Sequence, residues 1–555
     1  MRLFAAIAAG SLLMLSAPLP AVAQTHDGMD MSVDHAMPGM PEPTKETLGT
    51  VSFTTSCSPA VQPDFNRAVA LMHSFQFGPA IDGFHGILAR DPDCAIAWWG
   101  IALSSWSNPF AGFKSPGQLA QGLKAVQAGR AAAPKTARER AYIDAVAHLY
   151  EDAVHVDPST RLEAYETAMA KVSNDYPDDI EARIFYALAL AAAADPSDKT
   201  YAKQIKAGEI LEALFAKYPD HPGLAHYIIH AYDQPELAPR AAEAARRYGA
   251  IAPSTPHALH MPSHTFTRIG AWQASIDTNT ASAAAARKAG QPADELHASD
   301  YMVYAYLQTA QDEAARQLVV TSAETFKRFD PANVAGAAPA SAAFFANAAI
   351  PARYVLERRD WAGAVALTPH DSPFPYADAI TILARGLGAA HLKNEAVAQD
   401  SIDGLVRLHD RLVATQDSYW ADVVDIERLE VAGQLAIAKG DRAGALALLT
   451  KAAAMEDVTE LASITPGPFV PAREMLGELL LDQAHPAQAL AQFKATLAKE
   501  PNRFWSLYGA AKAAKRSGDA ATARTYFQQL LTIAVRADQP GRPALMEAGA
   551  FVAKK

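Results

Sequence analysis

Prolines recur along this chain at intervals of about 40 residues. The series is Pro92, Pro134, Pro177, Pro219, Pro253, Pro292 and Pro331, with intervals of 42, 43, 42, 34, 39 and 39 residues. Between these prolines the sequence is rich in Ala and Leu and lacks the apolar and polar alternation of a strand. A repeat of this length predicts stacked helical hairpins, because one hairpin cannot bury its apolar face without a neighbour.

Length and composition narrow the class of protein. At 555 residues the chain is too long for one compact core, so we expect several domains or an extended array. Half of the residues are hydrophobic and one-fifth are charged, as in an ordered soluble protein. The net charge of −11 includes no basic tract, which argues against nucleic acid or an anionic membrane as the main partner.

The first 23 residues have the pattern of a secretory signal peptide. Arg2 is followed by an apolar run over residues 3–15, and Ala21 and Ala23 form a small-residue cleavage site. We therefore expect cleavage near Ala23 and a periplasmic or secreted protein; an uncleaved membrane anchor is the alternative. No later stretch is apolar enough to span a bilayer, so we expect no integral membrane span.

Residues 24–50 predict a disordered arm that contains methionine and histidine. Gly, Pro, Asp and Thr are frequent there and aromatic residues are almost absent. The arm holds Met29, Met31, His35, Met37 and Met40. Thioether and imidazole together suit Cu(I), and imidazole alone suits Cu(II), which favours copper. The alternative is a Met-rich leader with no ligand.

The chain has two cysteines, Cys57 and Cys94. In an oxidising compartment a disulfide between them is favoured, tying the start of the mature fold to the next pair of helices. Ligation of a soft metal ion is the alternative.

Several units resemble the tetratricopeptide repeat. Residues 471–501 carry Leu476, Gly477, Leu480, Ala489, Phe493 and Pro501 at that family's spacing, and the next unit carries Gly518, Ala523 and Phe527. The 34-residue offset from Ala484 to Gly518 matches the family's repeat length. The resemblance covers most of residues 60–535, although units near 104–118 and 191–200 carry insertions.

This resemblance implies an all-α fold, a superhelical solenoid of tetratricopeptide-like hairpins in two lobes. We expect an N-terminal lobe at 51–325 and a C-terminal lobe at 326–545, because residues 329–343 turn rich in Ala and Pro. The stretches DPDCAIAWWGIAL, HPGLAHYIIHAYD, HALHMPSHTFTRIGAW and TPGPFVPAREMLGELL also resemble a group of exported bacterial tetratricopeptide proteins of no established activity.

Histidines are concentrated in one window of the N-terminal lobe. Seven of the seventeen fall between residues 221 and 297. His226 and His230 are four residues apart, and His257, His260 and His264 are spaced three and four apart, so each set forms one stripe on a helix. The resemblance to the tetratricopeptide family places these stripes on the first helix of each hairpin. In that family the first helices line the concave groove.

Imidazoles from neighbouring helices can meet, since adjacent axes lie about 8–10 Å apart. The predicted metal ligands are His226, His230, His260 and His264. The predicted supporting or alternative ligands are His257, His297, Asp233, Asp300 and Tyr304. Pro262 is expected to disturb its helix, either aiming His264 inward or shifting the register. A polar groove for peptides and simple packing are the competing interpretations.

The leading functional prediction is an exported repeat protein that binds a transition metal, copper first and zinc or iron as alternatives. The second is a metal-free scaffold presenting its groove to envelope proteins or peptides. The third is a metal-dependent enzyme of unknown reaction with a lid at residues 104–118. No phosphate loop, nucleophile elbow or HExxH motif is present, so the sequence leaves the enzyme question open.

Overall fold

The computed structural model describes residues 46–111 and 114–554. The predicted signal peptide and the Met29 to Met40 run of the predicted arm lie outside these residues. The described residues from Thr47 onward form one compact unit. The last residues of the predicted arm are part of this fold: the Thr47 amide donates to Ser254 Oγ at 2.8 Å, and the Thr50 amide donates to the Asp220 carbonyl at 2.9 Å.

All regular structure in the described residues is helical. A short 3-10 turn, η1 (Pro59–Val61), comes first. The helices up to the histidine region are α1 (Gln62–His73), α2 (Phe77–Arg90), α3 (Ile96–Trp106), α4 (Pro116–Ala131), α5 (Ala137–Ala147), α6 (Pro158–Asp175), α7 (Ile180–Ala192), α8 (Ala202–Phe215), α9 (Pro222–Ala231), α10 (Ala238–Ile251), α11 (Pro256–His260), α12 (Pro262–Arg268) and α13 (Trp272–Lys288). The later helices are α14 (Pro292–Gln308), α15 (Asp312–Phe326), α16 (Ala340–Glu357), α17 (Trp361–Ala366), α18 (Pro375–His391), α19 (Glu395–Ala414), α20 (Ser418–Ala438), α21 (Arg442–Val458), α22 (Ala472–Asp482), α23 (Pro486–Lys499), α24 (Phe504–Arg516), α25 (Ala520–Ile533) and α26 (Pro543–Ala553).

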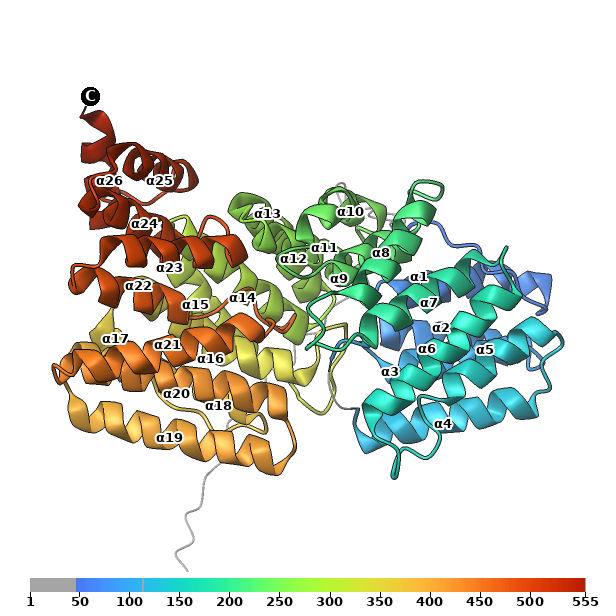
Figure 1. The fold of residues 1–555 in the computed structure, drawn as a ribbon. Helices are drawn as coiled ribbons and strands as arrows, with labels where there is room; N and C mark the ends of the chain where they lie inside the picture. The colour runs from blue at the N-terminus through green and yellow to red at the C-terminus, as the bar shows by residue number, and fades with distance from the viewer. Residues whose placement is uncertain (1–45, 112–113, 555) are drawn as a thin grey trace, which may run out of the picture. The chain divides into compact units, whose positions relative to one another are not determined.

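The helices are stacked as hairpins, which confirms the predicted all-α fold with its tetratricopeptide-like arrangement (Figure 1). Each helix packs on the next in sequence, as α13 does on α14 and α22 on α23. First helices of successive hairpins also contact each other, as in α7 with α9, α14 with α16 and α18 with α20. A helix bearing one apolar stripe is therefore covered from two sides.

The recurrent prolines mark where first helices begin. Pro92, Pro134, Pro177, Pro219, Pro253 and Pro331 lie in the links that lead into α3, α5, α7, α9, α11 and α16, and Pro292 is the first residue of α14. Proline suits these places because it cannot donate a backbone hydrogen bond inside a helix, while its fixed φ fits a helix start. Close approach within a hairpin needs small residues: a Cβ on Gly477 would lie 2.8 Å from the Phe493 ring.

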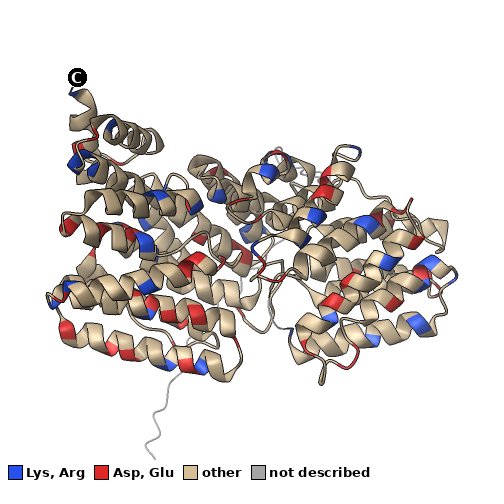
Figure 2. Cartoon of the chain, in the orientation of Figure 1, with Lys and Arg blue, Asp and Glu red and all other residues tan. Residues whose placement is uncertain are grey.

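Several buried clusters make up the interior of the unit. The largest draws on residues 48–337, and the next draws on residues 345–513. Acidic and basic residues are interspersed along the helices (Figure 2). Of the helices that the structure describes, none combines the length and apolarity needed to cross a bilayer. The predicted boundary between two lobes at residue 325 stays a prediction.

A disulfide joins Cys57 to Cys94 near the beginning of the described chain. It ties the segment before η1 to the residues just ahead of α3, across a sequence separation of 37. Phe53, in the same segment, is fully buried against the rings of Phe65, Trp99 and Tyr142. This segment therefore covers the first helices of the array.

Candidate metal centre

Six histidines converge from four neighbouring helices. His226 and His230 lie on α9, His257 and His260 on α11, His264 on α12 and His297 on α14. Their exposed fractions are 9% or less. The prediction placed these histidines along the concave groove of the array, and in the structure their side chains are buried. The six rings fall into two groups of three, within each of which one nitrogen per ring lies within 4.8 Å of the others.

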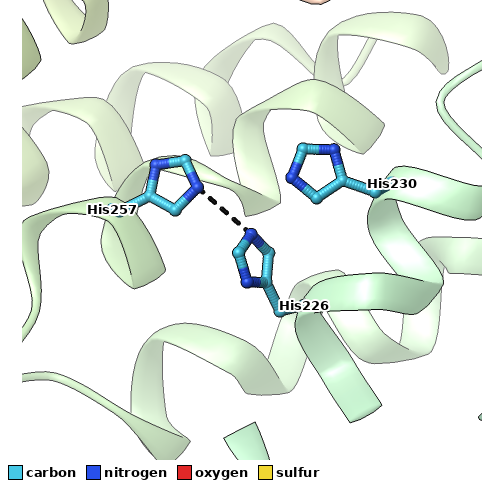
Figure 3. A group of neighbouring side chains, drawn as sticks. All are labelled: His226, His230 and His257. Atoms are coloured by element: carbon cyan, nitrogen blue, oxygen red, sulfur yellow. Dashed lines mark hydrogen bonds between the residues drawn. The ribbon is translucent and has the colours of Figure 1, made fainter. Parts of the chain in front are cut away.

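The first group contains His226, His230 and His257 (Figure 3). His226 and His230 are one helical turn apart on α9, and the His257 ring approaches them from α11. The Nε2 atoms of His226 and His257 are 3.1 Å apart. His226 Nδ1 is 2.6 Å from the His73 carbonyl oxygen and must donate to it, which leaves His226 Nε2 as a lone pair directed at His257. His230 Nε2 is buried without a hydrogen-bond partner.

The second group contains His260, His264 and His297. His260 Nδ1 lies 2.7 Å from Asn279 Oδ1, and the amide orientation is fixed because Asn279 Nδ2 donates to the Ser275 carbonyl at 2.8 Å. His264 Nδ1 lies 2.8 Å from Asp233 Oδ2. Both Nδ1 atoms therefore donate, and in neutral rings both Nε2 atoms carry lone pairs. These two Nε2 atoms face each other at 3.0 Å.

Two facing lone pairs repel unless a proton or a metal ion lies between them. A metal ion with bonds of about 2.0–2.1 Å to two imidazole nitrogens holds them about 2.9–3.4 Å apart. The 3.0 Å between His260 Nε2 and His264 Nε2 matches this range, and so does the 3.1 Å between His226 Nε2 and His257 Nε2, where a neutral His257 can also donate an ordinary hydrogen bond. The donor set and its spacing therefore fit a transition-metal ion.

Burial lowers the pKa of five of these imidazoles, His226, His230, His257, His260 and His297, and so favours their neutral form. Desolvation is the largest cause in each case, with repulsion from neighbouring histidines added to it. The pKa falls to about 3 for His226 and for His297, and well below its usual value for His230, His257 and His260. Neutral imidazole is the form that binds a metal ion.

The two groups are adjacent. The ring centroids of His257 and His260, which belong to different groups, are 6.1 Å apart, and those of His230 and His264 are 6.2 Å apart. The sequence predicted one site from His226, His230, His260 and His264. The structure brings these four histidines together but pairs His226 and His230 with His257, and His260 and His264 with His297.

Of the other residues predicted at the site, some contact the histidines and others bond to residues outside the two groups. Asp233 supports His264 and also accepts from Arg268 Nε at 3.1 Å. Burial alone would raise the pKa of Asp233, but the Arg268 charge and the His264 ring bring it below its usual value. Asp300 pairs instead with Arg353 at 2.8 Å, and Tyr304 bonds to Glu500 and Arg503.

A third buried group, His73, Glu181 and His221, differs in kind. The Nε2 atoms of both histidines lie against the Glu181 carboxylate, at 2.9 and 3.0 Å. Tyr227 Oη lies 3.0 Å from His73 Nδ1 and can donate to it. Each facing pair here has a donor and an acceptor, so the group needs no ion. His73 matters to the site through its carbonyl, a contact that no spacing in the sequence indicates.

Aromatic side chains cover the two histidine groups and separate them from solvent. Phe110, in the insertion between α3 and α4, stacks on His230 with centroids 4.2 Å apart, and Phe75 lies 5.3 Å from His257. Tyr301 packs 4.9 Å from both His260 and His264, and its hydroxyl donates to the Ser463 carbonyl at 3.0 Å. Residues far apart in sequence thus shield the six histidines from solvent.

Comparison with known proteins gives limited information. No family model matches the chain, and no curated protein matches it. Among solved structures, one titled "Human IFIT1 dimer with PPP-AAAA" aligns at 10% identity and a TM-score of 0.36, covering 80% of this chain and 91% of that one. Another, titled "Structure of Naa15/Naa10 bound to HypK-THB", aligns at 11% identity and a TM-score of 0.23, covering 86% and 71%. No ligand or partner follows from likeness at this level.

Proposed function

We propose that this chain binds transition-metal ions through its two adjacent histidine groups, one ion in each. The observation that carries the proposal is the pair His260 and His264. Their Nδ1 atoms are committed to Asn279 and Asp233, so when both rings are neutral two Nε2 lone pairs face each other 3.0 Å apart in a buried setting. A bound cation turns that repulsion into ligation, and the partners on Nδ1 orient both rings for it.

Copper is the first candidate ion, with zinc and iron as alternatives. Imidazole ligands suit all three metals. The Met29 to Met40 run, which lies outside the described residues, adds soft thioether donors that favour copper, and we propose that this arm delivers or shields the ion. The predicted signal peptide supports a role in the periplasm or outside the cell.

Burial favours ion binding over turnover of a bulky substrate. With exposed fractions of 9% or less, the six imidazoles offer no surface on which a large molecule could dock. The tetratricopeptide-like array then supplies the rigid frame that holds four helices in register around the ions. A substrate as small as water or dioxygen would still fit an enzyme of this kind.

The test is metal stoichiometry in full-length protein stripped with chelator and reloaded. We expect two tight equivalents for the unaltered chain. His226→Ala/His257→Ala and His260→Ala/His264→Ala should each retain one equivalent, and the variant with all four changes none. Elemental analysis after dialysis gives the count, and calorimetry with Cu(II) and Zn(II) ranks the metals.

A matched control is His155→Ala, since that histidine is exposed and paired only with Asp152. Circular dichroism and the thermal midpoint of each metal-free variant establish that the fold survives. Equal metal content in the unaltered protein and the four-site variant, with the fold intact, would show the proposal to be wrong.

A further inference from the structure

A cavity that differs chemically from the histidine groups lies in the C-terminal half of the described chain. Helices α18, α20 and α21 and the segment 459–470 enclose a volume of about 80 Å³. Glu427 and Glu430, one turn apart on α20, line it together with Glu456 of α21. The exposed fractions of Glu427 and Glu430 are only 6% and 3%.

Glu427 and Glu430 lack the cations that usually accompany buried carboxyl groups. None of the side chains that line the cavity belongs to Lys, Arg or His. Glu427 Oε2 is buried without a hydrogen-bond partner. Glu456 accepts from the backbone amides of Ala472, at 3.1 Å, and Arg473, and it feels the charges of Lys499 and Glu500. The nearby Glu460 is paired with Lys199 outside the cavity. An unpaired carboxylate is costly to bury, so burial favours the protonated form of Glu427 and Glu430 unless a cation lies beside them.

Aromatic rings form much of the remaining wall. Tyr376 and Trp420 stack with centroids 4.0 Å apart, and Phe345 and Phe469 also line the space. Faces of Trp, Tyr and Phe attract cations, and alkyl groups pack well against them. Acidic side chains and aromatic rings on the wall of one cavity are a combination that suits an organic cation.

A metal ion fits this cavity less well. Among the described residues, the groups whose ligand atoms lie close enough to share one ion do not include Glu427, Glu430 or Glu456. A hydrated divalent cation would also gain little from the aromatic wall. An ammonium group with an alkyl chain uses both features, since its N–H groups bond to separated carboxylates while its carbons contact the rings.

We propose that this cavity binds a small primary alkylammonium ion. Its ammonium group donates to Glu427 and Glu430, and its alkyl chain lies against Trp420 and Tyr376. The site is separate from the histidine groups, so this proposal and the metal proposal stand or fall independently.

The protonation state of the carboxyl groups in the cavity gives cation binding a measurable signature. Burial raises the pKa of Glu427 to about 8 and of Glu456 to about 7, and burial with neighbouring carboxyl groups raises that of Glu430 well above its usual value. The remaining titratable side chains on the wall besides Glu460 are Tyr376 and Tyr419, whose pKa values are raised to about 12, chiefly by burial. Binding of a cation near neutral pH should therefore ionise carboxyl groups and release protons to the buffer.

Calorimetry on the full-length protein with n-butylamine as the probe tests the proposal. We expect saturable binding whose heat changes with the ionisation enthalpy of the buffer, and no binding of the neutral analogue n-butanol. Glu427→Gln/Glu430→Gln should weaken the affinity about 10- to 100-fold, because hydrogen bonds to charged groups are lost. These amides resemble the protonated carboxyl groups, so the fold should persist, as the thermal midpoint will show.

The control variant is Glu324→Gln, an exposed residue paired with Lys327, which should bind butylamine normally. Butylamine affinity unchanged in the folded double variant, equal binding of butanol, or binding of Ca²⁺ in place of the amine would overturn the proposal. Tight binding of tetramethylammonium, which has no N–H group, would overturn the assignment of a primary amine.

Discussion

Asp233 has two tasks at the second histidine group. One carboxylate oxygen accepts from His264 Nδ1, and the other accepts from Arg268 Nε. The first bond fixes the tautomer that points a lone pair at His260. The second keeps Asp233 ionised in a buried place, since the guanidinium charge offsets the cost of desolvation. At this scale, the chemistry of the site depends on which nitrogen of each ring carries the proton.

Asp233→Asn tests that dependence. An amide presents one oxygen and one NH₂ where the carboxylate has two oxygens, so either His264 or Arg268 loses its acceptor. We expect the affinity of the second group for metal to fall about 10- to 100-fold, as for other partners of metal-binding histidines. Calorimetric titration in the background of His226→Ala/His257→Ala isolates this group. An affinity equal to that of the background variant would mean that Asp233 has no part in orienting His264.

At the scale of helices, a glycine at the start of α9 allows this helix to approach α1 closely. A Cβ on Gly223 would lie 2.4 Å from His73 Nδ1, so no side chain fits where the start of α9 meets the end of α1. The same contact matters to the first histidine group, because the His73 carbonyl at the end of α1 accepts from His226. A carbonyl in the last turn of a helix has no partner within the helix, which leaves it free for this role.

Gly223→Ala should therefore displace the His73 ring and the carbonyl next to it. We expect a loss of about 1–3 kcal/mol in the free energy of unfolding from overpacking, and weaker metal binding at the first group with the second unchanged. Urea denaturation and metal titration measure the two effects. Gly86→Ala is the control, because a Cβ there meets no atom within 4 Å and should be neutral or slightly stabilising. Equal behaviour of the two variants would contradict this account.

Sequence spacing predicted which helices carry the histidines but not how the histidines divide. His226 and His230 lie on one face of α9 as the spacing indicates. Pro262 ends the continuity of the next helix, so His257 and His260 lie on α11 and His264 begins a separate turn on α12. The way in which the two histidine groups face each other depends on this break between α11 and α12. It cannot be deduced from a helical period, which assumes an unbroken helix.

For the whole molecule, periodicity predicts neighbours along the array and misses contacts between distant segments. The stacked hairpins follow from prolines and apolar stripes. The bond from Tyr301 to Ser463 and the bond from Trp272 Nε1 to the Asn502 carbonyl, at 2.9 Å, join residues 162 and 230 positions apart. Such contacts depend on the three-dimensional path of the whole array, and no local sequence pattern predicts them. They also explain why Asp300 and Tyr304, predicted at the site, bond elsewhere.

The beginning of the array offers a test of how its parts depend on each other. End repeats of a solenoid have one uncovered face and fray first unless capped. Here the segment around Phe53 covers that face, and the Cys57–Cys94 disulfide holds it in place. A link across a sequence separation of 37 should contribute about 4 kcal/mol by restricting the unfolded chain. Without it, α1 should loosen and its His73 carbonyl should leave His226.

We therefore expect Cys57→Ser/Cys94→Ser to raise amide hydrogen exchange in α1–α3 while α24–α26 keep their protection. Metal binding should weaken at the first histidine group and persist at the second, which is held by α11, α12 and α14. Exchange mass spectrometry and metal titration on the same samples measure both effects. A uniform rise in exchange along the chain, or equal losses at both groups, would show instead that the array opens as one cooperative unit.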